Sequence, residues 1–265
     1  MIIQDLVDFL DKKLYPEYQE SYDNAGLILG DTKQELQGVL TTTDITPKVI
    51  DEAIVKGCNF IISHHPLIFK GIKRITSADE TGRMVMQLLK HCITVYAAHT
   101  NLDNLEWGVN GILSQRLGLE KCHILRPMNE SLDSVGAGMF GQLPHPLPMD
   151  KFLCFVKEKL KLPVIRVSAN YHPNAKKEII KIAICGGSGS FLIDDAIACG
   201  ADIFLTGDLK YHDFQSAEDS IVLADIGHYE SEQFAKELFY HLISEKFSNF
   251  ACQISEQDCG YINYI

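Results

Sequence analysis

The sequence lacks several features that would place it in a common functional class. No apolar run in its 265 residues is long enough to cross a membrane, and its first residues lack the basic start of a secretory signal. It has 24 Lys and Arg against 35 Asp and Glu, a formal net charge of −11. This acidic balance argues against general nucleic-acid binding, which needs a basic surface. We therefore expect a cytoplasmic protein that binds neither membrane nor nucleic acid.

Two further absences concern cysteine and glycine motifs. None of the eight cysteines forms a C-x-x-C pair, and we expect reduced, mostly buried thiols, with Cys252 and Cys259 left open as a redox pair. The sequence has neither the G-x-x-x-x-G-K-[ST] loop nor the full G-x-G-x-x-G fingerprint. Gly186-Gly187-Ser188-Gly189 follows an apolar segment, and it is either a tight turn or a cradle for an anion, the turn being favoured.

What the sequence does contain is an alternation of strand and helix patterns. Residues 2–14 have helical apolar spacing, and Thr46-Pro47 is typical of a helix N-terminus. His228 is expected to open one long helix to about Lys246, and the middle of the chain, about 120–178, is less regular. The alternation predicts an α/β fold with parallel strand pairing. Further strands are expected at 38–42, 58–64, 93–98, 181–185, 202–206 and 221–225, and further helices at 79–91, 107–117 and 149–161.

The chain also contains an internal repeat. Residues 51–63 align with residues 194–206 without a gap, at a shift of 143 positions, with Asp, Ala-Ile and Gly in one register. This similarity predicts an internal duplication. We expect two structurally related α/β lobes, residues 1–125 and 126–265, which together form one compact domain with a metal site in the cleft between them.

Polar groups follow the apolar strands of both halves. They are His64-His65, His99 with Asp103, Gly207-Asp208, and His228 with Glu232. Ligands bind at the carboxyl ends of strands in open α/β sheets, and imidazole and carboxylate together suit Zn, Mn, Fe or Co. Adjacent strand residues point to opposite faces, so His64 and His65 are expected to hold different ions of a two-metal centre. Taken singly, each group could instead be an incidental loop histidine, a turn residue or a helix cap.

The ordered set of these motifs resembles the NIF-three-like family, whose bacterial members are known as GTP cyclohydrolase 1 type 2 homologs. The similarity spans essentially the whole chain and resembles the short form, without an inserted domain. The motifs that carry it are Asn24-Ala25-Gly26-Leu27, Ser63-His64-His65-Pro66, Phe69-Lys70-Gly71, His99-Thr100-Asn101-Leu102-Asp103, Thr206-Gly207-Asp208, Gly227-His228 and Ser231-Glu232.

The resemblance implies a dinuclear centre with two divalent ions per subunit. Its ligands carry over to five residues, and it also implies a toroidal homohexamer. These ligands are His64, His65, Asp103, His228 and Glu232. The implied activity is metal-dependent hydrolysis of a small nucleotide-like or phosphorylated substrate by a metal-bridging hydroxide. The alternative is a non-catalytic metal-binding or regulatory protein that forms a ring.

For other polar residues near these motifs, more than one role is open. His99 and Asp208 are the candidate catalytic residues: His99 in proton transfer or in support of a ligand, and Asp208 in orienting a ligand histidine or capping a helix. The flanking cations could hold substrate phosphates or be solvated surface charges, and His212 could line the cavity or cap a helix. These cations are Lys70, Lys73, Arg74 and Lys210.

Overall fold

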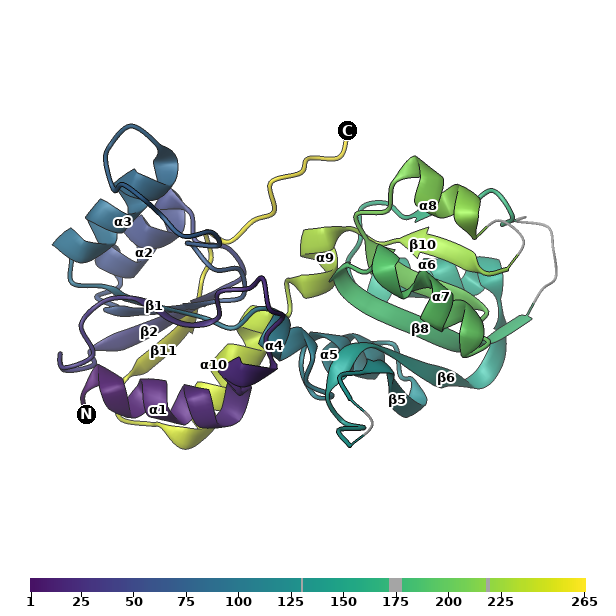
Figure 1. Cartoon of the computed structure of the whole chain (residues 1–265), viewed down its shortest axis with the longest axis horizontal. Coiled ribbons are helices and arrows are strands. Elements are labelled where there is room, and N and C mark those ends of the chain that lie inside the picture. The colour runs from purple at the N-terminus through teal and green to yellow at the C-terminus, as the bar shows by residue number, and fades with distance from the viewer. Residues whose placement is uncertain (130, 172–177, 218–219) are drawn as a thin grey trace. The chain divides into compact units, whose positions relative to one another are not determined.

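The computed structural model describes residues 1–129, 131–171, 178–217 and 220–265 of the chain. The chain divides into two compact units, each with its own β-sheet. Unit 1 comprises residues 1–102 and 234–261, and unit 2 comprises residues 103–233 and 262–265. Figure 1 labels the helices and strands of both.

The sheet of unit 1 is parallel except at one edge. Its strand order is β1-β4-β3-β2-β11, and β1 pairs antiparallel with β4 while the other pairs are parallel. Every residue of the three central strands is buried, as expected for parallel strands covered on both faces. The strands are β1 (Gly26–Leu29), β2 (Gly38–Thr42), β3 (Phe60–Ser63), β4 (Thr94–Ala97) and β11 (Ala251–Ile254).

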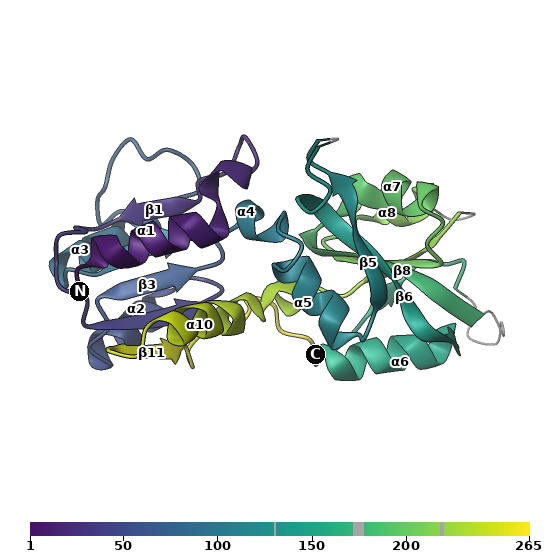
Figure 2. The same ribbon diagram turned by 90° about the horizontal axis from the view of Figure 1, so that it is seen from below.

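Helices cover both faces of this sheet. Figures 1 and 2 show α2 (Pro47–Val55) and α3 (Glu80–Lys90) on one face, and α1 (Ile3–Leu14) and α10 (Ala235–Lys246) on the other. Between α2, α3 and the sheet lies an apolar core that includes Leu40, Val49, Ile50, Ile61, Leu88 and Val95. Two short elements complete the unit, the 3-10 helix η1 (Pro16–Tyr18) and α4 (Thr100–Asp103), whose last residue begins unit 2.

The sheet of unit 2 is mixed, with strand order β5-β6-β8-β9-β10-β7. Strands β8, β9 and β10 are parallel, whereas β5, β6 and β7 pair antiparallel with their neighbours. The strands are β5 (Glu120–Pro127), β6 (Gly136–Pro148), β7 (Arg166–Val167), β8 (Glu178–Ser188), β9 (Ile203–Gly207) and β10 (Val222–Asp225).

Helices also cover both faces of the second sheet. Figure 2 shows α7 and α8 on one face and α5 and α6 on the other. The helices are α5 (Val109–Arg116), α6 (Met149–Lys159), η2 (Ser190–Leu192), α7 (Ile193–Ala198), α8 (Tyr211–Ser216) and α9 (His228–Glu232). Within the described ranges of both units, we find no helix that combines the length and the apolar character needed to cross a membrane.

The two units share one strand topology. β2-β3-β4 of unit 1 and β8-β9-β10 of unit 2 are parallel triplets in the same order. Val39 pairs with Phe60 in one, and Ile182 pairs with Ile203 in the other, which is the shift of 143 residues seen in the sequence. A duplicated unit would have this register, and the duplication itself stays a prediction.

The unit boundaries differ from the expected division between residues 125 and 126. Strand β5 pairs with β6 and therefore belongs to the second sheet from its first residue, Glu120. At the other end, β11 pairs with β2 and returns the chain to the first sheet. Strand pairing, rather than the midpoint of the sequence, sets the limits of each unit.

Most of the expected strands and helices are confirmed to within a few residues. The predicted N-terminus at Thr46-Pro47 is confirmed, because the Thr46 hydroxyl accepts a hydrogen bond from the Val49 N–H at 3.2 Å. The middle of the chain, about 120–178, is more regular than expected, since its described residues include the long strands β5 and β6 as well as the expected helix α6, while residues 130 and 172–177 lie outside the described ranges. The prolines at 144 and 146 fall where the pairing of β6 with β8 shifts register between Gln142 and Leu147, so they remove no regular ladder bond.

The long helix expected from His228 to Lys246 is instead two helices. α9 ends at Glu232 and α10 begins at Ala235. The division into units falls at the same place, between Gln233 and Phe234. One continuous helix could not serve both, because α9 packs on β8 and β9 and α10 packs on β2 and β11.

The cysteines are free thiols, but they are less buried than expected. Only Cys58 and Cys185 are buried, whereas Cys92, Cys154 and Cys259 are exposed. Apolar spacing alone did not distinguish core positions from helix ends and surface turns. No disulfide joins any of the eight, so the suggested pair of Cys252 and Cys259 is not bonded here.

A buried carboxylate ties helix α2 to the end of unit 1. Glu52, with 9% of its surface exposed, accepts hydrogen bonds from the Ser255 hydroxyl and from the Glu256 and Gln257 N–H groups, and it pairs with Lys56 at 2.7 Å. Burial alone would raise the pKa of Glu52, but these hydrogen bonds outweigh it and lower the pKa below its ordinary value.

We predict that Glu52→Gln lowers the free energy of unfolding by about 1–3 kcal/mol at pH 7, because a charged acceptor of several bonds is lost. Since the folded pKa is lowered, this stabilisation is present above the unfolded pKa, about 4 for Glu, and is lost as the pH falls through the folded value. Urea unfolding between pH 3 and 7 measures it. Asp51→Asn, an exposed acid one residue away, is the control and should stay within about 0.5 kcal/mol of wild type. Equal effects of the two variants would contradict the prediction.

Candidate metal centre

Three histidine rings cluster at the strand ends of unit 1. The ring centroids of His64 and His65 lie 5.0 Å apart, and that of His99 lies 5.4 Å from the first and 5.5 Å from the second. We call these three residues the imidazole cluster. His64 and His65 follow β3, and His99 follows β4, so the parallel pairing of β3 with β4 brings them together.

Strand alternation had suggested that the rings of His64 and His65 point to opposite faces. They do not, because the chain leaves the strand at Ser63, whose hydroxyl donates to the His65 carbonyl at 2.8 Å. The His64 and His65 N–H groups still bond to the carbonyls of Thr42 and Thr43 on the neighbouring segment. The backbone is therefore fixed while the two side chains turn to the same side, within 5.0 Å of each other.

Each ring of the imidazole cluster is held at Nδ1 by an acceptor. His64 donates to the Ala98 carbonyl, His65 to the Asp44 carboxylate and His99 to the Asp23 carboxylate, each at 2.8 Å. A carbonyl cannot donate, so His64 carries its proton on Nδ1, and the carboxylates favour the same tautomer of the other two. Nε2 then keeps the lone pair that a divalent metal requires.

Asp23 is the most firmly fixed of these carboxylates. Its side chain is fully buried and also accepts from the Thr100 N–H at 3.0 Å and from the Thr100 hydroxyl. Burial would raise the pKa of Asp23, but the hydrogen bonds from His99 and Thr100 outweigh it and lower the pKa to about 2. Asp23 is therefore ionised at neutral pH.

Unit 2 contains a second histidine–carboxylate group at its own strand ends. His228, the first residue of α9, bonds through Nδ1 to Asp208 at 2.7 Å and through Nε2 to Glu232 at 3.1 Å. We call these three residues the His228 cluster. Both partners are carboxylates, so each ring nitrogen of His228 faces a hydrogen-bond acceptor. Glu232 is 3% exposed and one helical turn from His228, as the spacing of four had indicated.

Asp208 adopts an unusual backbone conformation to reach His228. Its φ of 56° lies in the left-handed region, which costs energy for a residue other than glycine. The Ser188 hydroxyl donates to its carboxylate at 2.5 Å. Burial raises the pKa of Asp208, but the bonds from Ser188 and His228 outweigh it and lower the pKa. Its contact is with a candidate ligand histidine, while its catalytic role stays a prediction.

Asp103 belongs to the surroundings of the same cluster. Its carboxylate and that of Glu232 both act on the buried thiol of Cys185, whose pKa burial raises and these two charges raise further. The Asp103 carbonyl accepts from the Asn110 side chain at 3.0 Å. Of the five predicted ligands, unit 2 contains Asp103, His228 and Glu232, with the last two in contact, and unit 1 contains the neighbouring rings of His64 and His65.

The two glycines near the end of β8, Gly186 and Gly187, leave room for Glu232. The Gly186 N–H donates to Asn110 and the Gly187 N–H to Ser231, each at 2.9 Å, so both amides are already used. Gly187 has φ of 63°, and a Cβ there would lie 2.1 Å from Oε1 of Glu232. The turn therefore needs glycine for space and for conformation.

Sequence reasoning missed the acceptors in unit 1. Asp44 follows β2 by two residues and could have been found by applying the strand-end rule to that strand as well. Asp23 precedes the Asn24-Ala25-Gly26-Leu27 motif, but nothing local shows that it reaches His99, 76 residues away. Among the flanking residues, Lys210 is the N-cap of α8, and its backbone N–H donates to the Asp213 carboxylate. Nδ1 of His212 lies 3.2 Å from Oε1 of Gln215.

Together, the fold and these side chains define an α/β protein with two sheets and with histidine–carboxylate groups at the strand ends of each. Comparison with known proteins identifies its family. The model of the Duf34/NIF3 (NGG1p interacting factor 3) family matches residues 1–259, and the chain belongs to this family. The expectation from the motifs is confirmed.

Individual relatives agree. The chain is 33% identical over 231 residues to the GTP cyclohydrolase 1 type 2 homolog of Clostridium acetobutylicum, covering 87% of this chain and 85% of that one. Among solved structures, the Staphylococcus aureus hypothetical protein SA1388 has a TM-score of 0.89 and 32% identity, covering 100% of this chain and 99% of that one. A Bacillus cereus protein related to NIF3 also has a TM-score of 0.89, with 21% identity and the same coverage, and so shows the shared fold.

We predict that Gly187→Ala destabilises the protein by more than its backbone conformation alone would cost. Gly200 is the matched control, because it also has a positive φ, 74°, but no atom lies within 4 Å of an added Cβ. Gly200→Ala should cost about 1–2 kcal/mol of unfolding free energy in urea. Gly187→Ala should cost more, because Glu232 must also move. Equal costs would show that Glu232 is not packed against this turn.

Proposed function

We propose that the protein is a dinuclear metal-binding hydrolase of the kind implied by the names of its relatives. The ligands would be His64, His65, Asp103, His228 and Glu232. The observation that carries the proposal is the state of the histidines in unit 1. A carbonyl or a carboxylate accepts a hydrogen bond from Nδ1 of each ring, so Nε2 carries the lone pair that can bind a metal ion. Metal-binding histidines in proteins are commonly held in this way.

The donor set fits divalent ions of Zn, Fe, Mn or Co type. Two imidazoles alone do not complete a coordination shell of at least four, so carboxylates are also needed. Glu232 is 3% exposed, and a buried carboxylate is costly without a cation or a proton partner. In the structure, that partner is Nε2 of His228. Metal binding at this nitrogen would displace its proton, so affinity should rise with pH.

The reaction would be hydrolysis of a small nucleotide-like or phosphorylated substrate. When bound, divalent ions lower the pKa of water and polarise the bond to be broken. His99 would move a proton at Nε2, and the ionised Asp23 at its Nδ1 would balance the charge. Asp208 would hold the ring of His228 in place, which makes it a positioning residue. We also propose a toroidal homohexamer, on the family resemblance alone.

The first test of the proposal is metal content with turnover. Purified protein should contain two ions per chain, and it should hydrolyse GTP or another member of a nucleotide and phosphoester panel. His65→Ala and Glu232→Ala should each lower the rate at least 100-fold while the fold, followed by circular dichroism, is kept. Metal without turnover across the panel, with loss of the oligomer on chelation, would favour the non-catalytic ring protein instead. One ion, or none, would overturn the dinuclear centre.

We further predict that Asp44→Asn weakens metal binding about 10- to 100-fold, because His65 loses the carboxylate that fixes its tautomer. Competition with a chelator measures the affinity. Asp8→Asn, an exposed acid on α1, is the matched control and should bind metal as wild type does. Unchanged affinity in Asp44→Asn would mean that His65 is not a ligand.

A further inference from the structure

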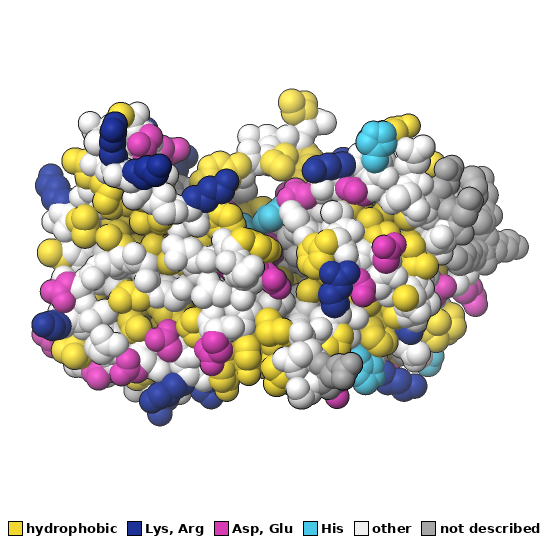
Figure 3. Space-filling model, viewed as in Figure 1, with side chains coloured by type: hydrophobic (Ala, Val, Ile, Leu, Met, Phe, Trp, Pro, Cys, Tyr) yellow, Lys and Arg dark blue, Asp and Glu magenta, His cyan; other side chains and the backbone are white. Residues whose placement is uncertain are grey.

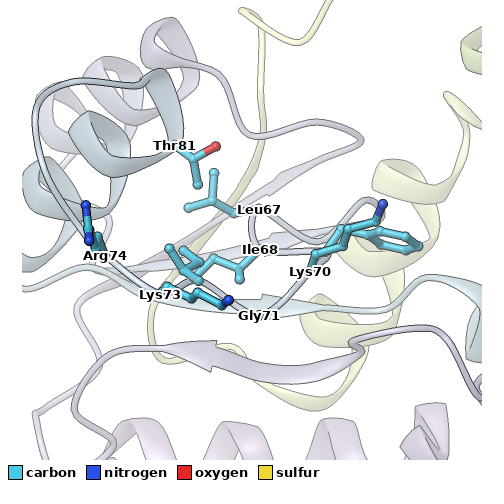
Figure 4. Close-up of a pocket in the computed structure, with 9 residues that line it drawn as sticks. Leu67, Ile68, Lys70, Gly71, Lys73, Arg74 and Thr81 are labelled. Atoms are coloured by element: carbon cyan, nitrogen blue, oxygen red, sulfur yellow. The ribbon is translucent and has the colours of Figure 1, made fainter.

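A pocket on unit 1 contains none of the five candidate metal ligands. It has a volume of about 600 Å³, within the range of small-molecule sites. Its walls come from the loop after β3 and from the start of α3. Figure 4 shows the lining residues, which are Leu67, Ile68, Phe69, Lys70, Gly71, Ile72, Lys73, Arg74 and Thr81.

The pocket concentrates positive charge in an acidic protein. Three cations, Lys70, Lys73 and Arg74, fall within five residues, although the formal net charge of the chain is −11. In the ranges that the structure describes, no carboxylate forms an ion pair with any of them. Figure 3 shows lysine and arginine side chains over α3 and the loop before it, with acidic side chains among them. Uncompensated cations around a concave site favour an anionic ligand.

The cations are spread along the pocket. Figure 4 shows Arg74 at one end and Lys70 at the other, with Lys73 between them. A single small anion could not contact all three, whereas a chain of phosphates or a ligand with separate phosphate groups could. Apolar side chains lie among the cations, with Phe69 40% exposed and Ile72 39% exposed, so the site also has surface for an organic group.

Phe69 links the pocket to the imidazole cluster. Its ring centroid lies 5.9 Å from that of His99, nearly perpendicular to it, and 6.3 Å from that of Tyr22. The Asn24 side chain donates to the Ile68 carbonyl at 2.6 Å and so fixes the loop at the residue before Phe69. The pocket and the imidazoles therefore share one wall within unit 1.

We propose that this pocket binds a small molecule that carries several phosphates, with the phosphates at Lys70, Lys73 and Arg74 and the organic part against Phe69. The organic part then lies beside His99, at the edge of the imidazole cluster. Only the purpose of such binding rests on the proposed hydrolase function, because the binding itself needs no metal.

The experiment compares Lys70→Ala/Lys73→Ala/Arg74→Ala with Lys33→Ala/Lys48→Ala/Lys90→Ala. Both variants remove three exposed cations from unit 1, but the second leaves the pocket intact. Calorimetry at fixed salt measures binding of inorganic tripolyphosphate, ATP and adenosine, to full-length protein as purified and after chelation. The pocket variant should lose at least 10-fold in affinity for tripolyphosphate and ATP, and the control should stay within 2-fold of wild type.

Phe69→Leu separates the two parts of the ligand. This variant should lower the affinity for ATP at least 3-fold and leave the affinity for tripolyphosphate unchanged, because only ATP has an organic part. If both triple variants lower the affinity for phosphates equally, the effect is due to net charge alone and the proposal is overturned. If binding is lost on chelation but is unchanged in the pocket variant, the phosphates bind to metal instead of to the pocket, and the proposal is overturned. Binding to phosphatidylserine vesicles but to neither soluble phosphate would also overturn it.

The protein could bind these phosphates through Lys70, Lys73 and Arg74 and yet contain no metal and show no turnover. That result would refute the hydrolase proposal and leave this inference standing.

Discussion

Hydrogen bonds at histidine Nδ1 organise the functional part of this protein. His65, His99 and His228 each bond there to a carboxylate, and His64 bonds to a carbonyl. A carboxylate in such a bond fixes both the rotation of the ring and the position of its proton, and at Asp23, whose side chain is fully buried, the charge is also costly to place. The strand ends, the short helix α4 and the left-handed turn at Asp208 are the means by which the backbone brings these partners into contact.

The two sheets provide this arrangement in different ways. In unit 1, three imidazoles converge and their acceptors come from segments next to β1, β2 and β4. In unit 2, one imidazole lies between two carboxylates, and a glycine turn leaves room for the buried one. The parallel triplets of strands share order and register, yet the residues that follow them differ. A common framework therefore carries two different sets of donor atoms.

Much of this could be predicted from the sequence, because local patterns carried it. The buried strands β2, β3 and β4 are short apolar runs bounded by polar residues. The start of α2 is also marked locally, by Thr46 at the N-cap and Pro47 at the first helical position. His64 and His65 directly follow strand β3, where the strand-end rule predicts polar groups, whereas the full set of five candidate ligands came from the family resemblance. The partners of the histidines were beyond reach where the contact is distant in sequence, as with Asp23 and His99. Strand β6 was missed because its prolines resemble a loop, and only its register shift accommodates them.

The order of segments in unit 1 has a consequence for biosynthesis. Unit 2 is nearly continuous, residues 103–233, whereas unit 1 needs residues 234–261 to supply α10 and β11. During synthesis from the N-terminus, β2 remains an open sheet edge until the last strand has left the ribosome. Glu52 likewise has no Ser255 to bind until then. Residues 103–233, the greater part of unit 2, are therefore synthesised before the segment 234–261, which closes the sheet that carries His64 and His65.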